Sequence, residues 1–237
     1  MEAGRAMEVR MCPRQRTLPA ALLAATVGLV VLAGCSTGQK VSSERAAAAN
    51  VARLRDEADD CFARFTRSRG SDLEALECFA EKHRQTIEIW SSPSLCPLCY
   101  LNYGFGLRLL GKYQYTLREK LQSDLERARA SADVTRLESA IAQADAKMKT
   151  YFRESNTILG LYLTAPGNLE PSVYLWLAQQ HFELGEHEVA VRNMTSFIDL
   201  VRGSASPDEL AGYERLRRTY QAAWNRAKLD SAVGNGR

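Results

Sequence analysis

The chain has 237 residues, which is enough for one domain with a sizeable core or for a short array of repeats. Its 31 basic and 28 acidic residues leave a net charge of only +3, and no basic run follows residue 35. The composition therefore disfavours a nucleic-acid-binding protein, and it indicates no electrostatic funnel for acidic substrates.

The first 34 residues have the organisation of a secretory signal. Arg10, Arg14 and Arg16 form a basic beginning, and a mostly apolar run over 18–33 follows them. The run closes with the sequence Leu-Ala-Gly-Cys, which ends at Cys35.

This ending resembles the lipobox of bacterial lipoproteins. The resemblance implies that residues 1–34 are cut off, and that Cys35 is lipidated on its thiol and acylated on the new N-terminus. Several acyl chains on one residue anchor a protein firmly, whereas a single chain gives only marginal binding. Because Ser36 rather than Asp follows the cysteine, the same resemblance implies an outer membrane lipoprotein that faces the periplasm.

Two other interpretations of this segment remain open. Roughly 17 apolar or small residues lie near the lower limit for a transmembrane helix. A plain secretory signal is the second alternative, because the pair Ala33-Gly34 also suits cleavage after small residues. In that case Cys35 is an ordinary cysteine.

The rest of the chain is predicted to be helical. Residues 36–42 are mostly small and polar, and the lipobox resemblance implies a lipid on Cys35, so we expect residues 35–42 to be a lipidated N-terminus and linker. Residues 43–229 are rich in Ala, Leu, Glu, Arg and Gln without strand alternation, which predicts an all-α domain, and 230–237 follow as a flexible tail. Ser206 and Glu209 form a capping box. Breaks that divide the domain into seven or eight helices fall at 68–71, 91–97, 111, 130–133, 165–171, 185 and 203–207.

Four cysteines remain after the signal and Cys35, an even number in an exported protein, and this predicts disulfide bonds. Cys61 and Cys78 lie nine and eight residues on either side of Gly70. A helical hairpin that turns at this glycine places them opposite each other, so we predict that they are bonded.

The other two cysteines form the sequence Cys96-Pro97-Leu98-Cys99. Pro97 can begin a helix, and the free amides of a helix start lower a thiol pKa, which favours attack by Cys96. No thioredoxin-like alternation of strands and helices surrounds the pair. A local structural disulfide and pairing with the first two cysteines are the alternatives. Zinc is disfavoured because only one CxxC is present and the compartment is oxidising.

The stretch 171–202 carries the clearest internal pattern. Its aromatic, apolar, small and turn positions are Tyr174, Leu177, Ala178, Gly185, Ala190 and Met194. The pattern resembles the tetratricopeptide repeat, in which two antiparallel helices pack closely. Two weaker units precede it, one with Tyr100, Tyr103, Gly104 and Gly111 and one with Ala63, Gly70, Ala75 and Phe79. The resemblance implies stacked helix pairs with a concave face for a partner; a non-repeat helical bundle is the alternative.

The region between the weak second unit and the strong third unit is longer than a 34-residue repeat. Apolar residues from Tyr113 to Leu125 can face those from Val134 to Tyr151 across two antiparallel helices. We therefore expect one extended helical hairpin within the solenoid.

No Gly-rich phosphate loop, nucleophile elbow or HExxH motif is present, so we expect no enzyme activity, cofactor or metal. The resemblance implies a lipid-anchored periplasmic adaptor for another envelope protein, such as an assembly factor for a secretion, pilus or motility machine. The candidate partner-binding residues are Tyr100, Tyr103, Tyr174 and His181. The alternatives are a thiol–disulfide protein that uses Cys96 and Cys99, and a small-ligand-binding component of a transporter.

Overall fold

The computed structural model describes residues 35–128 and 131–234, with side chains described for 43–128 and 132–232. The predicted signal, residues 1–34, lies outside this part. The chain divides into two units, residues 1–42 and 43–237. All the packing discussed below lies within the second unit.

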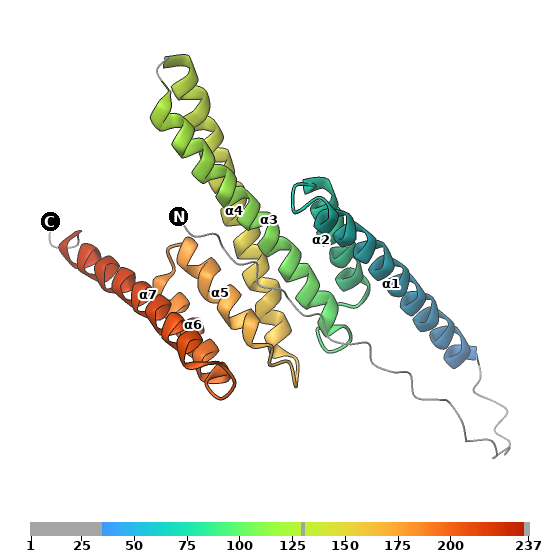
Figure 1. Ribbon diagram of the computed structural model, residues 1–237. Helices are drawn as coiled ribbons and strands as arrows, with labels where there is room; N and C mark the ends of the chain where they lie inside the picture. Colours follow the sequence, from blue (N-terminus) through green and yellow to red (C-terminus); the bar gives the residue numbers. More distant parts are fainter. Residues whose placement is uncertain (1–34, 129–130, 235–237) are drawn as a thin grey trace. The chain divides into compact units, whose positions relative to one another are not determined.

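The described residues form seven α-helices and no strand, so the all-α prediction is confirmed (Figure 1). From α2 onward each helix packs on the next helix in the sequence, which is the order expected of a solenoid. The helices are α1 (Cys35–Arg67), α2 (Leu73–Ile89), α3 (Pro97–Arg127), α4 (Ser131–Thr164), α5 (Pro171–Glu183), α6 (His187–Val201) and α7 (Pro207–Gly234).

Two helices extend beyond the predicted helical range of 43–229. The first helix begins at Cys35 rather than at Ser43, so the segment expected to be a linker is helical. No proline interrupts this segment, and the alanine run 46–49 favours extension of the helix toward its N-terminus. The last helix continues to Gly234, beyond its predicted end at residue 229, because no helix breaker stands between them.

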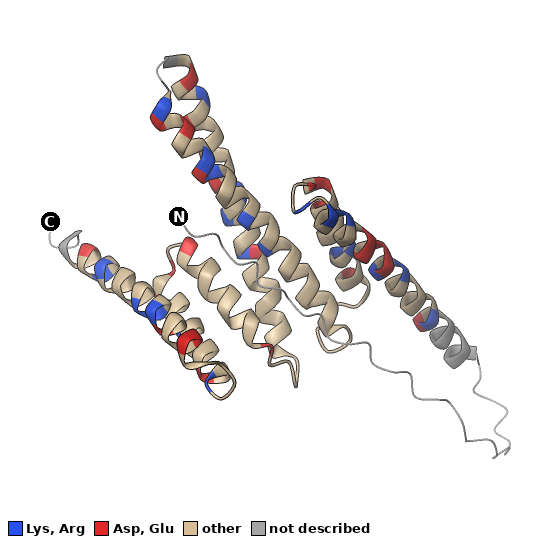
Figure 2. Ribbon diagram, viewed as in Figure 1, with Lys and Arg blue, Asp and Glu red and all other residues tan. Residues whose placement is uncertain are grey.

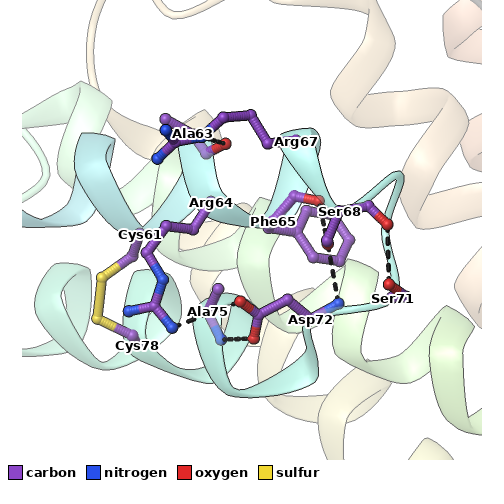
Figure 3. Close-up of polar contacts among 10 residues, drawn as sticks. All are labelled: Cys61, Ala63, Arg64, Phe65, Arg67, Ser68, Ser71, Asp72, Ala75 and Cys78. Atoms are coloured by element: carbon purple, nitrogen blue, oxygen red, sulfur yellow. Dashed lines mark hydrogen bonds and ion pairs between the residues drawn. A yellow bond between two sulfur atoms is a disulfide. The ribbon is translucent and has the colours of Figure 1, made fainter.

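The turns predicted from glycine and capping residues are confirmed. Gly70 and Gly185 end helices with positive φ values of 83° and 78°, which glycine adopts without steric cost. Asp72 then caps α2, where its side chain accepts a backbone N–H of the first turn at 2.9 Å (Figure 3). Ser206 and Glu209 exchange the two hydrogen bonds of a capping box at 2.8 and 3.3 Å.

The break predicted at Gly111 is wrong, because α3 continues through it without interruption. Gly111 and Gly104 instead allow α3 to approach α4. A Cβ atom at Gly111 would lie 2.4 Å from Cε1 of Phe152, and one at Gly104 would lie 2.6 Å from Cδ2 of Leu159. Both glycines therefore permit close helix packing rather than a turn, and the second repeat unit lacks the turn assigned to it.

The third and fourth helices form the extended antiparallel hairpin that the sequence predicts (Figure 1). Ala144 and Met148 are buried in it, and Leu117 is half-buried. Tyr113, which we expected in the interface, is 37 % exposed, and the neighbouring Gln114 is buried instead. The predicted stripe of α3 thus holds at Leu117, Leu121 and Leu125 but not at Tyr113.

Two disulfide bonds are present. Cys61 of α1 is bonded to Cys78 of α2, which confirms the predicted pair (Figure 3). Cys96 and Cys99 are bonded to each other at the start of α3, and they do not pair with the first two cysteines. The first bond borders the apolar cluster that α1, α2 and α3 share, in which Phe79 is buried.

Replacement of both Cys61 and Cys78 by alanine is expected to lower the free energy of unfolding by about 2–3 kcal/mol. The bond spans 17 residues of sequence, and a loop of that size restricts the unfolded polypeptide by about this amount. Urea unfolding followed by circular dichroism measures the change. A loss well below about 1 kcal/mol would contradict the constraint assigned to this bond.

Candidate functional site

A cleft of about 270 Å³ opens between α3, α5 and α7, with one further wall residue from α4. Since α3 pairs with α4 and α5 pairs with α6, two of the main walls are the first helices of successive pairs, and the third wall is α7, which packs on α6. The lining residues are Arg108, Lys112, Tyr115, Phe152, Gln179, Gln180, Glu183, Leu216 and Tyr220. Most of them are polar, but three aromatic rings and a leucine are included.

Arg108 is the deepest charge of this cleft. Its side chain is only 8 % exposed. The Nη2 group donates a hydrogen bond to Oε1 of Gln179 at 2.8 Å, and the guanidinium lies 5.3 Å from the centre of the Trp176 ring. Burial lowers the pKa of this guanidinium to about 10. Neither of its contacts supplies a negative charge.

Lys112 follows Arg108 by one helical turn and lines the same cleft. Desolvation, followed by repulsion from Arg108, lowers the pKa of its ammonium group. Among the ion pairs of the described residues, none includes either cation. The cleft therefore holds two positive charges that no carboxylate of the described residues neutralises.

Two adjacent glutamines on α5 supply neutral polar groups. Gln179 holds the guanidinium of Arg108, as described above. Gln180 is 1 % exposed and donates Nε2 to the carbonyl oxygen of Trp176 at 3.2 Å. Its Oε1 atom is buried without a hydrogen-bond partner. A buried amide oxygen of this kind is costly unless a donor reaches it.

Glu183 of α5 and Tyr220 of α7 also line the cleft. Burial raises the pKa of Glu183, and the Arg118 charge opposes this effect. Burial also raises the pKa of Tyr220 to about 12, with a smaller effect from Glu183. The Tyr220 ring stacks on Phe182 with 4.3 Å between ring centres. At neutral pH the phenol is therefore uncharged and fixed in place.

Charged side chains are sparse on two of the three helices that form this cleft, α3 in its first part and α5. Figure 2 shows Lys, Arg, Asp and Glu interspersed along α1 and α7, whereas α5 and the first part of α3 carry very few. Glu183 is the single Asp, Glu, Lys or Arg residue of α5, and Arg108 is the first of α3. Arg108 and Glu183 thus stand on helix segments that carry few other charges.

The predicted partner-binding tyrosines of α3 lie outside this cleft. Tyr100 is 4 % exposed and packs in a core cluster with Leu159 and Val173, so its expected role at a partner surface conflicts with its burial. Tyr103 is equally buried, and its hydroxyl donates to a carboxylate oxygen of Glu154. Burial followed by this hydrogen bond raises the pKa of Tyr103.

Tyr174 and His181 on α5 are both half-buried. Tyr174 packs against the cluster shared by α5, α6 and α7. The ring of His181 contacts Glu186 and lies 3.4 Å from the Asn156 side chain. The structure therefore does not bring the four predicted residues together, and none of them lines the cleft.

The cysteine pair at the start of α3 is inaccessible. Cys96 is 4 % exposed and Cys99 is fully buried, and both pack with Val51 of α1 in an apolar cluster. Thiol–disulfide exchange requires a thiolate to reach one of the two sulfur atoms. This burial favours a structural bond over a redox-active pair.

The sequence analysis missed the residues that line the cleft. One signal was available for Arg108, which is a lone cation within the apolar run 104–111. A charged side chain in such a run lies either in the interior or at the edge of the apolar helix face. A charge in the interior is unusual, so this position is a candidate for a functional residue. Gln179 and Gln180 carry no comparable signal, because neighbouring glutamines are ordinary on exposed helices.

No group of three or more His, Cys, Asp or Glu residues within the described ranges is arranged to hold a metal ion. None of the helices in the described part of the protein is long and apolar enough to span a bilayer. Comparisons with protein-family models, curated proteins and solved structures give no significant match. The function therefore has to be inferred from the residues and their geometry.

Proposed function

We propose that this protein is a lipid-anchored periplasmic adaptor that binds another envelope protein through the cleft between α3, α5 and α7. The proposal rests on which helices form the walls of the cleft. Two of the three main walls, α3 and α5, are the first helices of successive antiparallel pairs, and α7 packs after the second pair; stacked pairs present a concave binding face in this way.

The lipid anchor is the second part of the proposal. It rests on the resemblance of the sequence that ends at Cys35 to a lipobox, and on the basic and apolar segments before it. A triacylated N-terminus holds the domain at the membrane, so partner binding is restricted to the envelope. The tetratricopeptide resemblance of residues 171–202 supports the adaptor part of the proposal, because such repeats bind partner proteins.

Photo-crosslinking in intact cells tests the adaptor function. A photoreactive p-benzoylphenylalanine replaces Leu216, which lines the cleft, or Ala211, which is exposed on the same helix outside the cleft. We expect the Leu216 variant to capture one discrete envelope protein and the Ala211 variant to capture it at least fivefold less. Equal capture at both positions, or none at Leu216, would contradict docking in the cleft.

A Cys35→Ser variant tests the anchor. Without a thiol no lipid can be attached, so the protein is expected to move from the detergent phase to the aqueous phase in a phase-separation assay. Its crosslink from Leu216 is expected to fall several-fold, since the local concentration at the membrane is lost. A variant that has lost residues 1–34 and still stays in the detergent phase would show that Cys35 is not the site of attachment.

A further inference from the structure

We infer that Arg108 and Lys112 form a subsite for a carboxylate group of the polypeptide that occupies the cleft. This inference rests on the proposed function, and it assigns the chemistry of the bound group. It starts from a buried charge that the described residues leave uncompensated.

A guanidinium that is 8 % exposed loses most of its hydration, and such a charge is stable only when it is paired and hydrogen-bonded. The contacts of Arg108 are the neutral amide of Gln179 and the face of Trp176. These orient the guanidinium, but they do not neutralise it. An anionic ligand is the missing partner.

Lys112 increases the need for an anion. It stands four residues after Arg108 on α3, and like charges at this spacing destabilise a helix. The repulsion is visible in the lowered pKa of Lys112, to which desolvation and then Arg108 contribute. One carboxylate placed between the two cations would relieve both the repulsion and the desolvation of Arg108.

Glu183 is the carboxylate of the cleft itself, but it does not fill this role. Its electrostatic partners are Arg118 and Glu119, and burial raises its pKa. A carboxylate that neutralised Arg108 would have its pKa lowered instead. The counter-ion therefore has to come from outside the described residues.

Gln180 indicates that the ligand is a peptide rather than a free inorganic anion. Its buried Oε1 atom lacks a donor, and the N–H of a peptide bond is a suitable one. The apolar surfaces of Phe152 and Leu216 line the same cleft, and they can pack against the carbon atoms of a side chain. A carboxylate, an N–H group and an apolar stem occur together at an acidic residue or at the C-terminus of a polypeptide.

Nuclear magnetic resonance of the full-length protein in detergent, labelled with ¹⁵N at arginine Nε, tests the subsite. The probes are N-acetylglycine for a C-terminal carboxylate, N-acetylglutamic acid α-amide for an acidic side chain, N-acetylglutamine amide as the neutral analogue, and sodium phosphate. We expect a saturable shift of the Arg108 resonance with at least one of the two carboxylate probes. The one that binds more tightly identifies the source of the carboxylate.

Variants separate binding from structure. Lys112→Gln removes an exposed cation and is expected to weaken carboxylate binding at least fivefold, while Arg192→Gln on α6 leaves it unchanged. Arg108→Gln is expected to abolish the response, and unchanged far-ultraviolet circular dichroism shows that it has folded. Equal binding of the neutral analogue, tighter binding of phosphate, or no effect of Lys112→Gln would overturn the inference.

The two proposals fail in different ways. If the photo-crosslink from Leu216 persists in the Arg108→Gln variant, the adaptor function stands and the carboxylate subsite is wrong. If the carboxylate probes bind as expected but the crosslink captures no protein, the subsite stands and the adaptor function is wrong.

Discussion

A Gly104→Ala/Gly111→Ala double variant is expected to lose about 4 kcal/mol of unfolding free energy. Each added Cβ atom would lie less than 3 Å from Leu159 or Phe152, and both of these side chains are buried. Overpacking of this kind costs up to about 3 kcal/mol at each site. The higher helix propensity of alanine offsets about 1 kcal/mol of this cost at each site. Urea unfolding followed by circular dichroism measures the loss.

Gly160→Ala is the matched control on α4. No heavy atom lies within 4 Å of the position where its Cβ would stand. Helix propensity alone acts there, so a gain of about 0.5–1 kcal/mol is expected. If the double variant were as stable as wild type, the close approach of α3 to α4 at Gly104 and Gly111 would be refuted.

Acidification is expected to destabilise the domain through His83. This side chain is 1 % exposed, and neither of its ring nitrogens has a hydrogen-bond partner. Burial, assisted by the Arg55 charge, lowers its pKa from 6.5 to about 4. The unfolded state therefore binds a proton below pH 6.5 that the folded state binds only near pH 4. The contribution of His83 to the free energy of unfolding is complete above pH 6.5, and the free energy of unfolding falls by about 3 kcal/mol as the pH drops to 4.

The comparison of wild type with a His83→Leu variant isolates this effect. Leucine fills a similar volume without polar atoms, so the variant is expected to be about 1 kcal/mol more stable at pH 7.5 and several kcal/mol more stable at pH 4. Urea titrations at intervals between pH 4 and 7.5 give the difference. Parallel pH profiles for the two proteins would rule out His83 as the titrating group.

Local sequence signals predicted most of the secondary structure. The turns at Gly70 and Gly185 follow from backbone freedom, and the Cys61–Cys78 bond follows from the hairpin that the first turn creates. Gly111 is a position at which the local sequence does not decide the structure. A glycine serves equally for a turn or for close packing, and only the presence of Phe152 on another helix decides between them.

The candidate site was much less predictable. Tyr100 and Tyr103 share a helix face, which suits either a groove or a core, and the structure places both in the interior. Arg108 was visible as an isolated cation, but its meaning depends on α5, which supplies Gln179 from 71 residues away. Polar clefts built from three helices are properties of long-range packing, and no local pattern encodes them.

The packing of each helix mainly on its sequence neighbour governs how the domain opens. Contacts between neighbours close short loops, so refolding is expected to be fast. In a linear stack, unfolding can also proceed from one end, one helix at a time. At one end a disulfide bond joins α1 to α2, whereas α7 contains no cysteine and rests on α6 through noncovalent contacts. Amide protons of α7 are therefore expected to exchange with solvent before those of α2 and α3.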